Sequence, residues 1–390
     1  MSKVPTKYKH SFMDYYNAHG IIPVRDMSSD TQSFNFRRNY LYKTLGIPLN
    51  QLKNRKVIEF GPGGGFNAVA TSNFEPELYV FVDATHASLT ELKHKSEQKK
   101  FGAKKVEIIE SNIFDYRDER KYDLVICEGV LPGQDNPKKM LQHVGSFCDS
   151  GGILITTTMS ATSQFSEICR RLLRPSIIAS NQTFLEQTKI AVDLFKNHID
   201  TLGVSTRSPE DWVQDVILHN WHTGEYIFTM PDSLAALGDD FEFYSSSPRF
   251  LHDGRWYKQI SPASASINML LNDQYAAFNT LLLDFRIPLD SLNQRNDIAK
   301  IAMIDPLCEA ACKVHDKISE ENSYDRLEEF IAILNKVTAI LPQEFDITVR
   351  SINDFISGIS SFASGNTNAD FGSFKQWWGR GQQYISYIKT

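Results

Sequence analysis

The residues best suited to chemistry lie in one short run, residues 56–66, where an apolar stretch ends in an acid and glycines follow. Glu59 closes the apolar stretch, and glycines occupy positions 61, 63, 64 and 65. Because glycine has no Cβ, it allows tight turns and lets a ligand approach the backbone closely. The N-terminal amides of a following helix would face the same crevice. The pattern predicts a nucleotide-type binding site.

Two common glycine-rich motifs do not fit this run. A dinucleotide-binding turn needs a glycine where this chain has Phe66, and a P-loop needs Lys followed by Ser or Thr. The Glu-x-Gly-x-Gly-x-Gly spacing instead resembles motif I of the class I S-adenosylmethionine (SAM) methyltransferases. That resemblance implies that the amino-acid part of SAM lies against Glu59 and the amides of Gly61, Gly63 and Gly65. An ordinary tight turn between strand and helix remains the alternative.

Two further strand ends extend the resemblance. Residues 78–83 predict a buried strand ending on Asp83, whose carboxylate could accept hydrogen bonds from a ribose diol, with Ala84 beside it. Asp83 could instead cap the next helix. After a third strand, Asn112 stands where the family usually has an acid that binds the adenine amine. Its side-chain oxygen can still accept that bond, and Ile113 would then pack against the ring.

Residues 122–131 resemble motif IV of small-molecule methyltransferases and make Glu128 and Gly129 further cofactor-binding candidates. Methyl transfer from a sulfonium is an in-line displacement that mainly needs alignment. A base is needed only for a hydroxyl or protonated amine acceptor, and the catalytic candidates are Glu128, His219 and His222. A backbone-only role for Glu128 and a structural role for the two histidines remain open.

The residues before the first strand predict a cover over the cofactor. Residues 34–42 have the pattern of an amphipathic helix that carries Arg37 and Arg38. Either arginine could match the SAM carboxylate with a bidentate hydrogen bond. Simple packing of a helix with surface arginines is the alternative.

A metal site is not expected. Cys308, Cys312 and His315 are spaced to share one face of a helix. A zinc site requires a fourth ligand and usually has a turn between its cysteines. Small apolar cysteines on a buried stripe explain the spacing as well.

These sites require an α/β fold with a Rossmann-like class I methyltransferase sheet of seven strands, the last antiparallel. The last two strands are expected at residues 241–244 and 255–260, and a final helix at residues 374–388. The expected domains are a helical N-terminal cover (1–52), a SAM-binding methyltransferase domain with a helical insertion (53–260, insertion 160–225) and an all-helical C-terminal domain (261–390).

Composition narrows the function. The 390 residues carry a formal net charge of −6 and no long Lys/Arg run, which argues against a nucleic-acid partner. The N-terminus lacks a signal pattern, and no apolar stretch approaches the roughly 18 residues of a membrane span. The five cysteines suggest no disulfide framework. We therefore expect a cytoplasmic protein.

Together the patterns predict a SAM-dependent methyltransferase that acts on a hydroxyl or amine of a small molecule or sugar. Residues 38–48 and 59–63 also resemble, in a general way, bacterial methyltransferases associated with surface-polysaccharide synthesis, which implies a glycan acceptor. The C-terminal helices could form a homo-oligomer. The alternatives are an NAD or nucleotide-sugar oxidoreductase of Rossmann type and a non-catalytic SAM-binding scaffold that recruits a partner through its helices.

Overall fold

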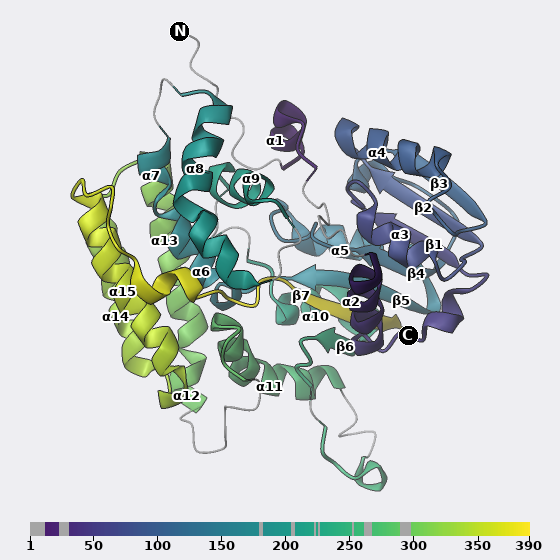
Figure 1. Cartoon of the computed structure of the whole chain (residues 1–390). Coiled ribbons are helices and arrows are strands. Elements are labelled where there is room, and N and C mark those ends of the chain that lie inside the picture. The colour runs from purple at the N-terminus through teal and green to yellow at the C-terminus, as the bar shows by residue number, and fades with distance from the viewer. Residues whose placement is uncertain are drawn as a thin grey trace. The chain divides into compact units, whose positions relative to one another are not determined.

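The chain folds into two compact units, shown in a computed structural model (Figure 1). Unit 1 comprises residues 1–158, 228–275 and 382–390, and unit 2 comprises residues 159–227 and 276–381. The structure describes residues 12–22, 31–178, 182–203, 207–221, 224, 227–251, 253–260, 267–288 and 298–390.

Unit 1 is built on a seven-stranded sheet with the order β3-β2-β1-β4-β5-β7-β6. The first five strands are parallel, and β7 runs antiparallel to both β5 and β6. This confirms the Rossmann-like sheet expected from the sequence, with its antiparallel last strand. The strands are β1 (Lys56–Phe60), β2 (Leu78–Asp83), β3 (Lys105–Glu110), β4 (Tyr122–Cys127), β5 (Cys148–Thr158), β6 (Phe241–Ser247) and β7 (Gln383–Lys389).

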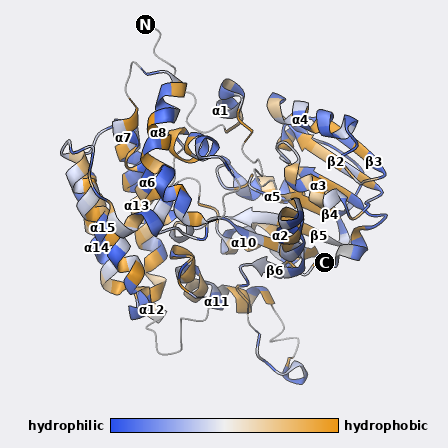
Figure 2. Ribbon diagram, in the orientation of Figure 1, coloured by the Kyte–Doolittle hydropathy of each residue, from blue (hydrophilic) through white to orange (hydrophobic). Residues whose placement is uncertain are grey.

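Helices cover both faces of this sheet, which is why its central strands read as continuous apolar runs. All six residues of β2 are buried, and Figure 2 shows the hydrophobic colour along the central strands. One face packs against α2 (Thr31–Thr44), α3 (Phe66–Ser72) and α4 (His86–Glu97) through a shared apolar cluster. On the other face, α5 (Pro137–Gly145) contacts β4, β5 and α10 (Met230–Leu237).

The smaller elements of unit 1 connect these layers. They are α1 (Phe12–His19), η2 (Leu49–Leu52), η3 (Ile113–Asp115), η8 (Gly238–Asp240), η9 (Tyr257–Gln259) and α11 (Ile267–Thr280), the last of which runs on into unit 2.

Two expectations about the end of the sheet are wrong. Residues 255–260 form no strand: they hold the short helix η9, and Trp256 and Tyr257 are exposed. The position beside β5 belongs to β7, in the segment expected to form the helix 374–388. Gly379 and Gly381 interrupt that segment, and the remaining residues are rich in Ile and Tyr, which favour strands.

Unit 2 is helical and is organised around one hydrophobic cluster. The cluster joins Phe165 and Cys169 from the region after β5 to Cys308 and Phe330 from the later helices. The helices of residues 160–225 and those beyond 276 therefore lie in one unit, whereas the sequence placed them in different domains. Its elements are η4 (Thr162–Gln164), α6 (Phe165–Arg171), α7 (Arg174–Ile177), α8 (Phe184–Ile199), η5 (Asp200–Leu202), α9 (Pro209–Trp212), η6 (Val213–Leu218, a π-helix), η11 (Leu281–Leu283), α12 (Ile298–Ala302), α13 (Ile304–Glu321), α14 (Leu327–Ile340), η12 (Gln343–Phe345), α15 (Asp346–Ala363) and η13 (Gly372–Gln376).

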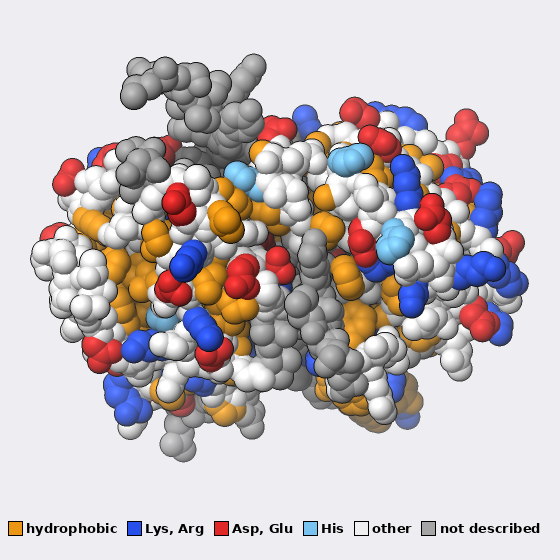
Figure 3. Space-filling view, turned by 45° about the horizontal axis from the view of Figure 1, so that its top comes forward, with side chains coloured by type: hydrophobic (Ala, Val, Ile, Leu, Met, Phe, Trp, Pro, Cys, Tyr) orange, Lys and Arg blue, Asp and Glu red, His pale blue; other side chains and the backbone are white. Residues whose placement is uncertain are grey.

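The surface carries charges of both signs. On the face drawn in Figure 3, acidic and basic side chains are interspersed. Among the described residues, no helix combines the length and apolarity that crossing a bilayer requires.

Candidate cofactor site

The glycine turn joins the carboxyl end of β1 to α3, and each of its three spaced glycines has a left-handed backbone. The φ angles of Gly61, Gly63 and Gly65 are +65°, +56° and +73°. A Cβ at Gly61 would lie 2.5 Å from Val130 Cγ2, and a Cβ at Gly65 would lie 2.6 Å from Leu92 Cδ2. A Cβ at Gly63 would meet no atom of the described residues within 4 Å. Two of these glycines are therefore needed for internal packing, whereas Gly63 faces open space.

Asp83 ties this turn to the end of β2. Its Oδ2 accepts a hydrogen bond from Gly63 N at 3.3 Å, and its Oδ1 accepts from Thr85 N at 2.8 Å and Thr85 Oγ1 at 2.7 Å. Burial raises the pKa of Asp83, while the bonds from Thr85 and Gly63 oppose the shift. The backbone amide of Ala84 also stabilises the charged carboxylate, so donors of the chain already surround both Asp83 oxygens. Ala84, beside it, is half-buried.

Arg38 and Glu128 form a bidentate ion pair. Arg38 Nη1 donates to Glu128 Oε2 and Arg38 Nη2 to Glu128 Oε1, both at 3.0 Å. Burial disfavours the charged guanidinium, but the Glu128 carboxylate outweighs this and raises the pKa of Arg38 above its ordinary value. Arg38 Nε is buried with no partner among the described residues. Arg37, its neighbour, is half-buried.

Glu59 is also buried, and Tyr79 Oη donates a hydrogen bond to its carboxylate. Burial, together with the Glu128 carboxylate, raises the pKa of Glu59 to about 7, although the Tyr79 bond opposes the shift. A role for Tyr79 was not predicted from the sequence. The pairing of β1 with β2 places Glu59 opposite Phe81, and Tyr79 lies two positions earlier on the same face. A polar side chain in an otherwise apolar strand was the available signal.

Asn112 caps the short helix η3. Its Oδ1 accepts a hydrogen bond from Phe114 N at 2.9 Å, so the oxygen expected at the adenine amine already has one donor. A carboxamide oxygen has a second lone pair. Ile113 follows and is half-buried.

Gly129 stands at the end of β4, where its amide donates to Thr157 Oγ1 at 2.8 Å. It has a φ of +72° and is exposed. It therefore lies one residue beyond the Arg38–Glu128 pair, at the carboxyl ends of the parallel strands, where open α/β sheets bind ligands.

The remaining catalytic candidates are the two histidines. His219 belongs to unit 2, where it is buried and its carbonyl accepts a hydrogen bond from Arg171 Nη2 at 3.4 Å. His222 lies outside the described residues.

The cysteines and histidine on α13 lie in the core of unit 2. Cys308 and Cys312 are fully buried in its hydrophobic cluster. His315 Nδ1 lies 3.1 Å from Asp316 Oδ1. The described residues contain no group of three or more His, Cys, Asp or Glu side chains placed to hold a metal ion.

Part of the chain matches a known protein family. The sequence profile of a methyltransferase-domain family matches residues 51–202. A malonyl-[acyl-carrier protein] O-methyltransferase of Ilyobacter polytropus is 26% identical over 111 residues, which are 28% of this chain and 41% of that protein. The chain thus spans about two fifths of the length of this curated relative.

Solved methyltransferases resemble the chain at low identity. PKMT2 from Rickettsia typhi in complex with AdoHcy is 18% identical, with 62% of this chain and 49% of that chain covered and a TM-score of 0.38. Magnesium protoporphyrin IX methyltransferase from Synechocystis with bound SAH is also 18% identical, with 47% and 86% covered and a TM-score of 0.34.

The sheet order, the glycine turn and the matched family define the class of protein. The chain carries a class I SAM-dependent methyltransferase domain. The cofactor of that class is S-adenosylmethionine. The space at Gly63 beside the Asp83 carboxylate and the Arg38 Nε, which has no partner among the described residues, fit such a ligand.

Proposed function

We propose that the protein transfers the methyl group of SAM to a hydroxyl or amine of a small molecule or sugar. The main support for the proposal is the open space at Gly63. This glycine has no side chain to fill the space, which lies beside the Asp83 carboxylate. The cofactor supplies an activated methyl group, and the chain's residues hold and orient it.

Each polar group at the strand ends then binds one part of SAM. Asp83 accepts hydrogen bonds from the ribose hydroxyls, and Asn112 accepts one from the adenine amine through its second lone pair. The amides of the glycine turn and the Arg38 Nε–H surround the amino-acid part, whose carboxylate needs charged or strongly polar donors.

Glu128 is a positioning residue here and not the base. Both of its oxygens are engaged by Arg38, and Asn67 Nδ2 lies 3.5 Å from Oε2. His219 and His222 remain the candidates for a base if the acceptor is a hydroxyl.

The test has two stages. Isothermal titration calorimetry should first show that the purified protein binds SAM and S-adenosylhomocysteine but not NAD. A mass-spectrometric screen with SAM and pooled sugars, amines and hydroxylated small molecules should then yield a product heavier by one methylene. Failure to bind SAM would overturn the proposal. Binding without any methylated product would favour a non-catalytic SAM-binding scaffold that recruits a partner through its helices.

A further inference from the structure

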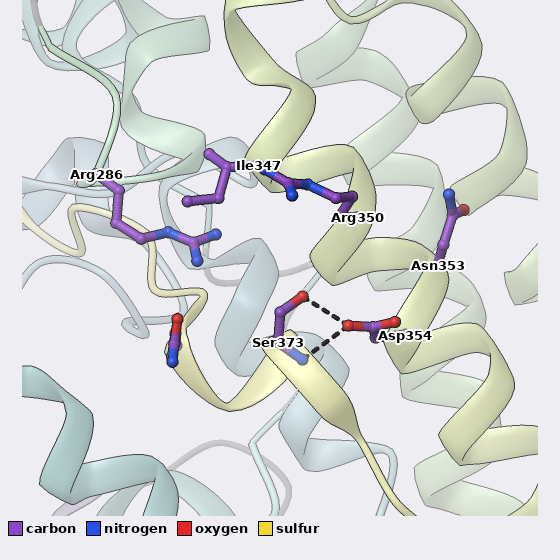
Figure 4. Close-up of a pocket in the computed structure, with 7 residues that line it drawn as sticks. Arg286, Ile347, Arg350, Asn353, Asp354 and Ser373 are labelled. Atoms are coloured by element: carbon purple, nitrogen blue, oxygen red, sulfur yellow. Dashed lines mark hydrogen bonds between the residues drawn. The ribbon is translucent and has the colours of Figure 1, made fainter.

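A pocket lies within unit 2, and none of the residues assigned to the cofactor lines it. It has a volume of about 420 Å³ and is formed by the segment after η11, by α15 and by η13 (Figure 4). Six of its seven lining residues are polar or charged: Arg286, Arg350, Asn353, Asp354, Ser373 and Gln376, with Ile347 as the apolar member. This volume suits a small molecule better than a single ion, because small-molecule sites span roughly 300–1,000 Å³.

Arg286 is fixed in place by a buried carboxylate. Its Nε and Nη2 donate to Asp284 Oδ1 and Oδ2 at 2.9 and 2.6 Å, and Nη2 also donates to Ser351 Oγ at 3.1 Å. The side chain of Asp284 is fully buried. Arg286 Nη1 is buried as well and has no partner among the described residues. A buried donor without an acceptor is costly, and an oxygen of a bound ligand would satisfy it.

Arg350 brings a second guanidinium, which has no ion-pair or hydrogen-bond partner in the part of the chain that the structure describes. Asp354 lies four residues along α15, the spacing of a helical ion pair. Its carboxylate instead accepts from Ser373 N at 2.7 Å and Ser373 Oγ at 2.6 Å. In Figure 4, Arg286 and Arg350 extend toward each other from opposite sides of the pocket.

Two carboxamides complete the lining, on Asn353 and Gln376. A carboxamide can donate to one oxygen and accept from a hydroxyl. Asp354 can also accept from a hydroxyl, because Ser373 occupies only Oδ2. The pocket therefore combines donors for an anionic group with acceptors for hydroxyl groups.

We propose that this pocket binds a small hydroxylated anion, with its carboxylate or phosphate on Arg286 and Arg350 and its hydroxyls on Asn353, Asp354 and Gln376. Planar guanidinium groups match either anion with paired hydrogen bonds. The site does not depend on the proposed methyl transfer.

The test is isothermal titration calorimetry of the full chain with four probes: glucose 6-phosphate, glucuronate, inorganic phosphate and glucose. At least one of the two hydroxylated anions should bind, more tightly than inorganic phosphate, and glucose should not bind measurably. Arg350→Gln should weaken binding about tenfold or more, since it removes hydrogen bonds to a charged group. Arg326→Gln, at a half-buried arginine of unit 2 that pairs with Glu321 and does not line the pocket, should leave affinity unchanged.

A second variant tests the hydroxyl contacts separately from the anion contacts. Gln376→Ala should weaken binding of the hydroxylated anion and leave the affinity for inorganic phosphate unchanged. The proposal is overturned if neither hydroxylated anion binds, if Arg350→Gln binds as tightly as the unmodified protein, or if inorganic phosphate binds as tightly as the hydroxylated anions.

Discussion

Arg38 and Glu128 are 90 positions apart in the sequence, yet they meet in a bidentate ion pair with side chains only 8% and 7% exposed. Arg38 lies on α2, before the sheet begins, and Glu128 directly follows β4. Tyr42, one turn further along α2, adds a hydrogen bond of 2.5 Å between its hydroxyl and Thr71 Oγ1 on α3. These contacts anchor α2 at the carboxyl ends of the strands.

Breaking this ion pair from one side should destabilise unit 1. Glu128→Gln leaves a buried guanidinium without its counter-charge, so the free energy of unfolding should fall by about 3 kcal/mol, and by a similar amount in Arg38→Gln. The double variant should lose less than the sum in a urea-denaturation double-mutant cycle. The matched change Lys53→Gln, in the exposed pair with Glu75, should have little effect. Additive losses would show that the two side chains are not coupled.

Gly63→Ala should separate ligand binding from stability. The added Cβ meets no atom of the described residues within 4 Å but would enter the space assigned to SAM, so SAM affinity should fall strongly in calorimetry. Gly151→Ala is the matched control, because Gly151 also has a positive φ and open space around its Cβ. Both variants should lose about 1 kcal/mol of stability from backbone strain. Equal SAM affinity in the two variants would contradict the assignment of Gly63 to the cofactor site.

Asp83→Ala should weaken SAM binding about tenfold or more, since it removes a charged acceptor. It also removes the acceptor of Gly63 N, so the glycine turn loses a contact. Asp83→Asn keeps an oxygen for the Thr85 bonds and should give an intermediate loss. Calorimetry with Asp149→Ala, at an exposed position of β5, supplies the control. A folded Asp83→Ala protein with full SAM affinity would remove Asp83 from the site.

Glu59 predicts a pH dependence of stability. Its pKa is about 7 in the folded protein, against an ordinary value of 4.5. Between these values the folded state binds more protons than the unfolded state, so this group lowers the free energy of unfolding as pH rises. The Glu59→Gln variant has no carboxyl group to titrate at this position. The free energy of unfolding of the variant minus that of the unmodified protein should therefore increase by roughly 1–3 kcal/mol from about pH 5 to pH 8.

Urea denaturation of both proteins across this pH range, without SAM, measures that difference, because the other titrating groups are common to the two proteins. A difference that is constant with pH would mean that Glu59 has an ordinary pKa in the folded state.

A chain that ends at Gly381 should not form a stable unit 1. It lacks β7, which pairs with β5 on one side and β6 on the other. The loss of two strand pairings should abolish SAM binding and leave an open sheet edge that aggregates. A chain that ends at Lys389 keeps β7 and should bind SAM normally. Light scattering and calorimetry on both chains check this, and SAM binding by the shorter chain would contradict it.

Local patterns predicted the first five strands and the glycine turn because each signal lies within a few residues. An apolar run that ends on Glu59 or Asp83 indicates both a buried strand and the polar end that meets a ligand. The long helices were predictable for the same reason: the apolar residues of α13 and α14 recur at helical spacing and pack into one cluster.

The partners of these side chains could not be predicted, because they are distant in sequence. Nothing near Arg38 indicates that Glu128 will neutralise it, so the sequence assigned the two residues separate roles. The last strand was missed because its pairing with β5 and β6 decides its conformation, and tertiary pairing overrides a weak local preference.

The place of β7 in the sheet sets an order of events during protein synthesis. Translation delivers β1 to β5 first, then the first part of unit 2, then β6, and then the rest of unit 2 before residues 383–389 leave the ribosome. Until then β6 has no neighbouring strand, and the edge of β5 that later pairs with β7 has no hydrogen-bonding partner in the sheet. The sheet that holds the methyltransferase site is therefore completed last, after every residue of unit 2 has been synthesised.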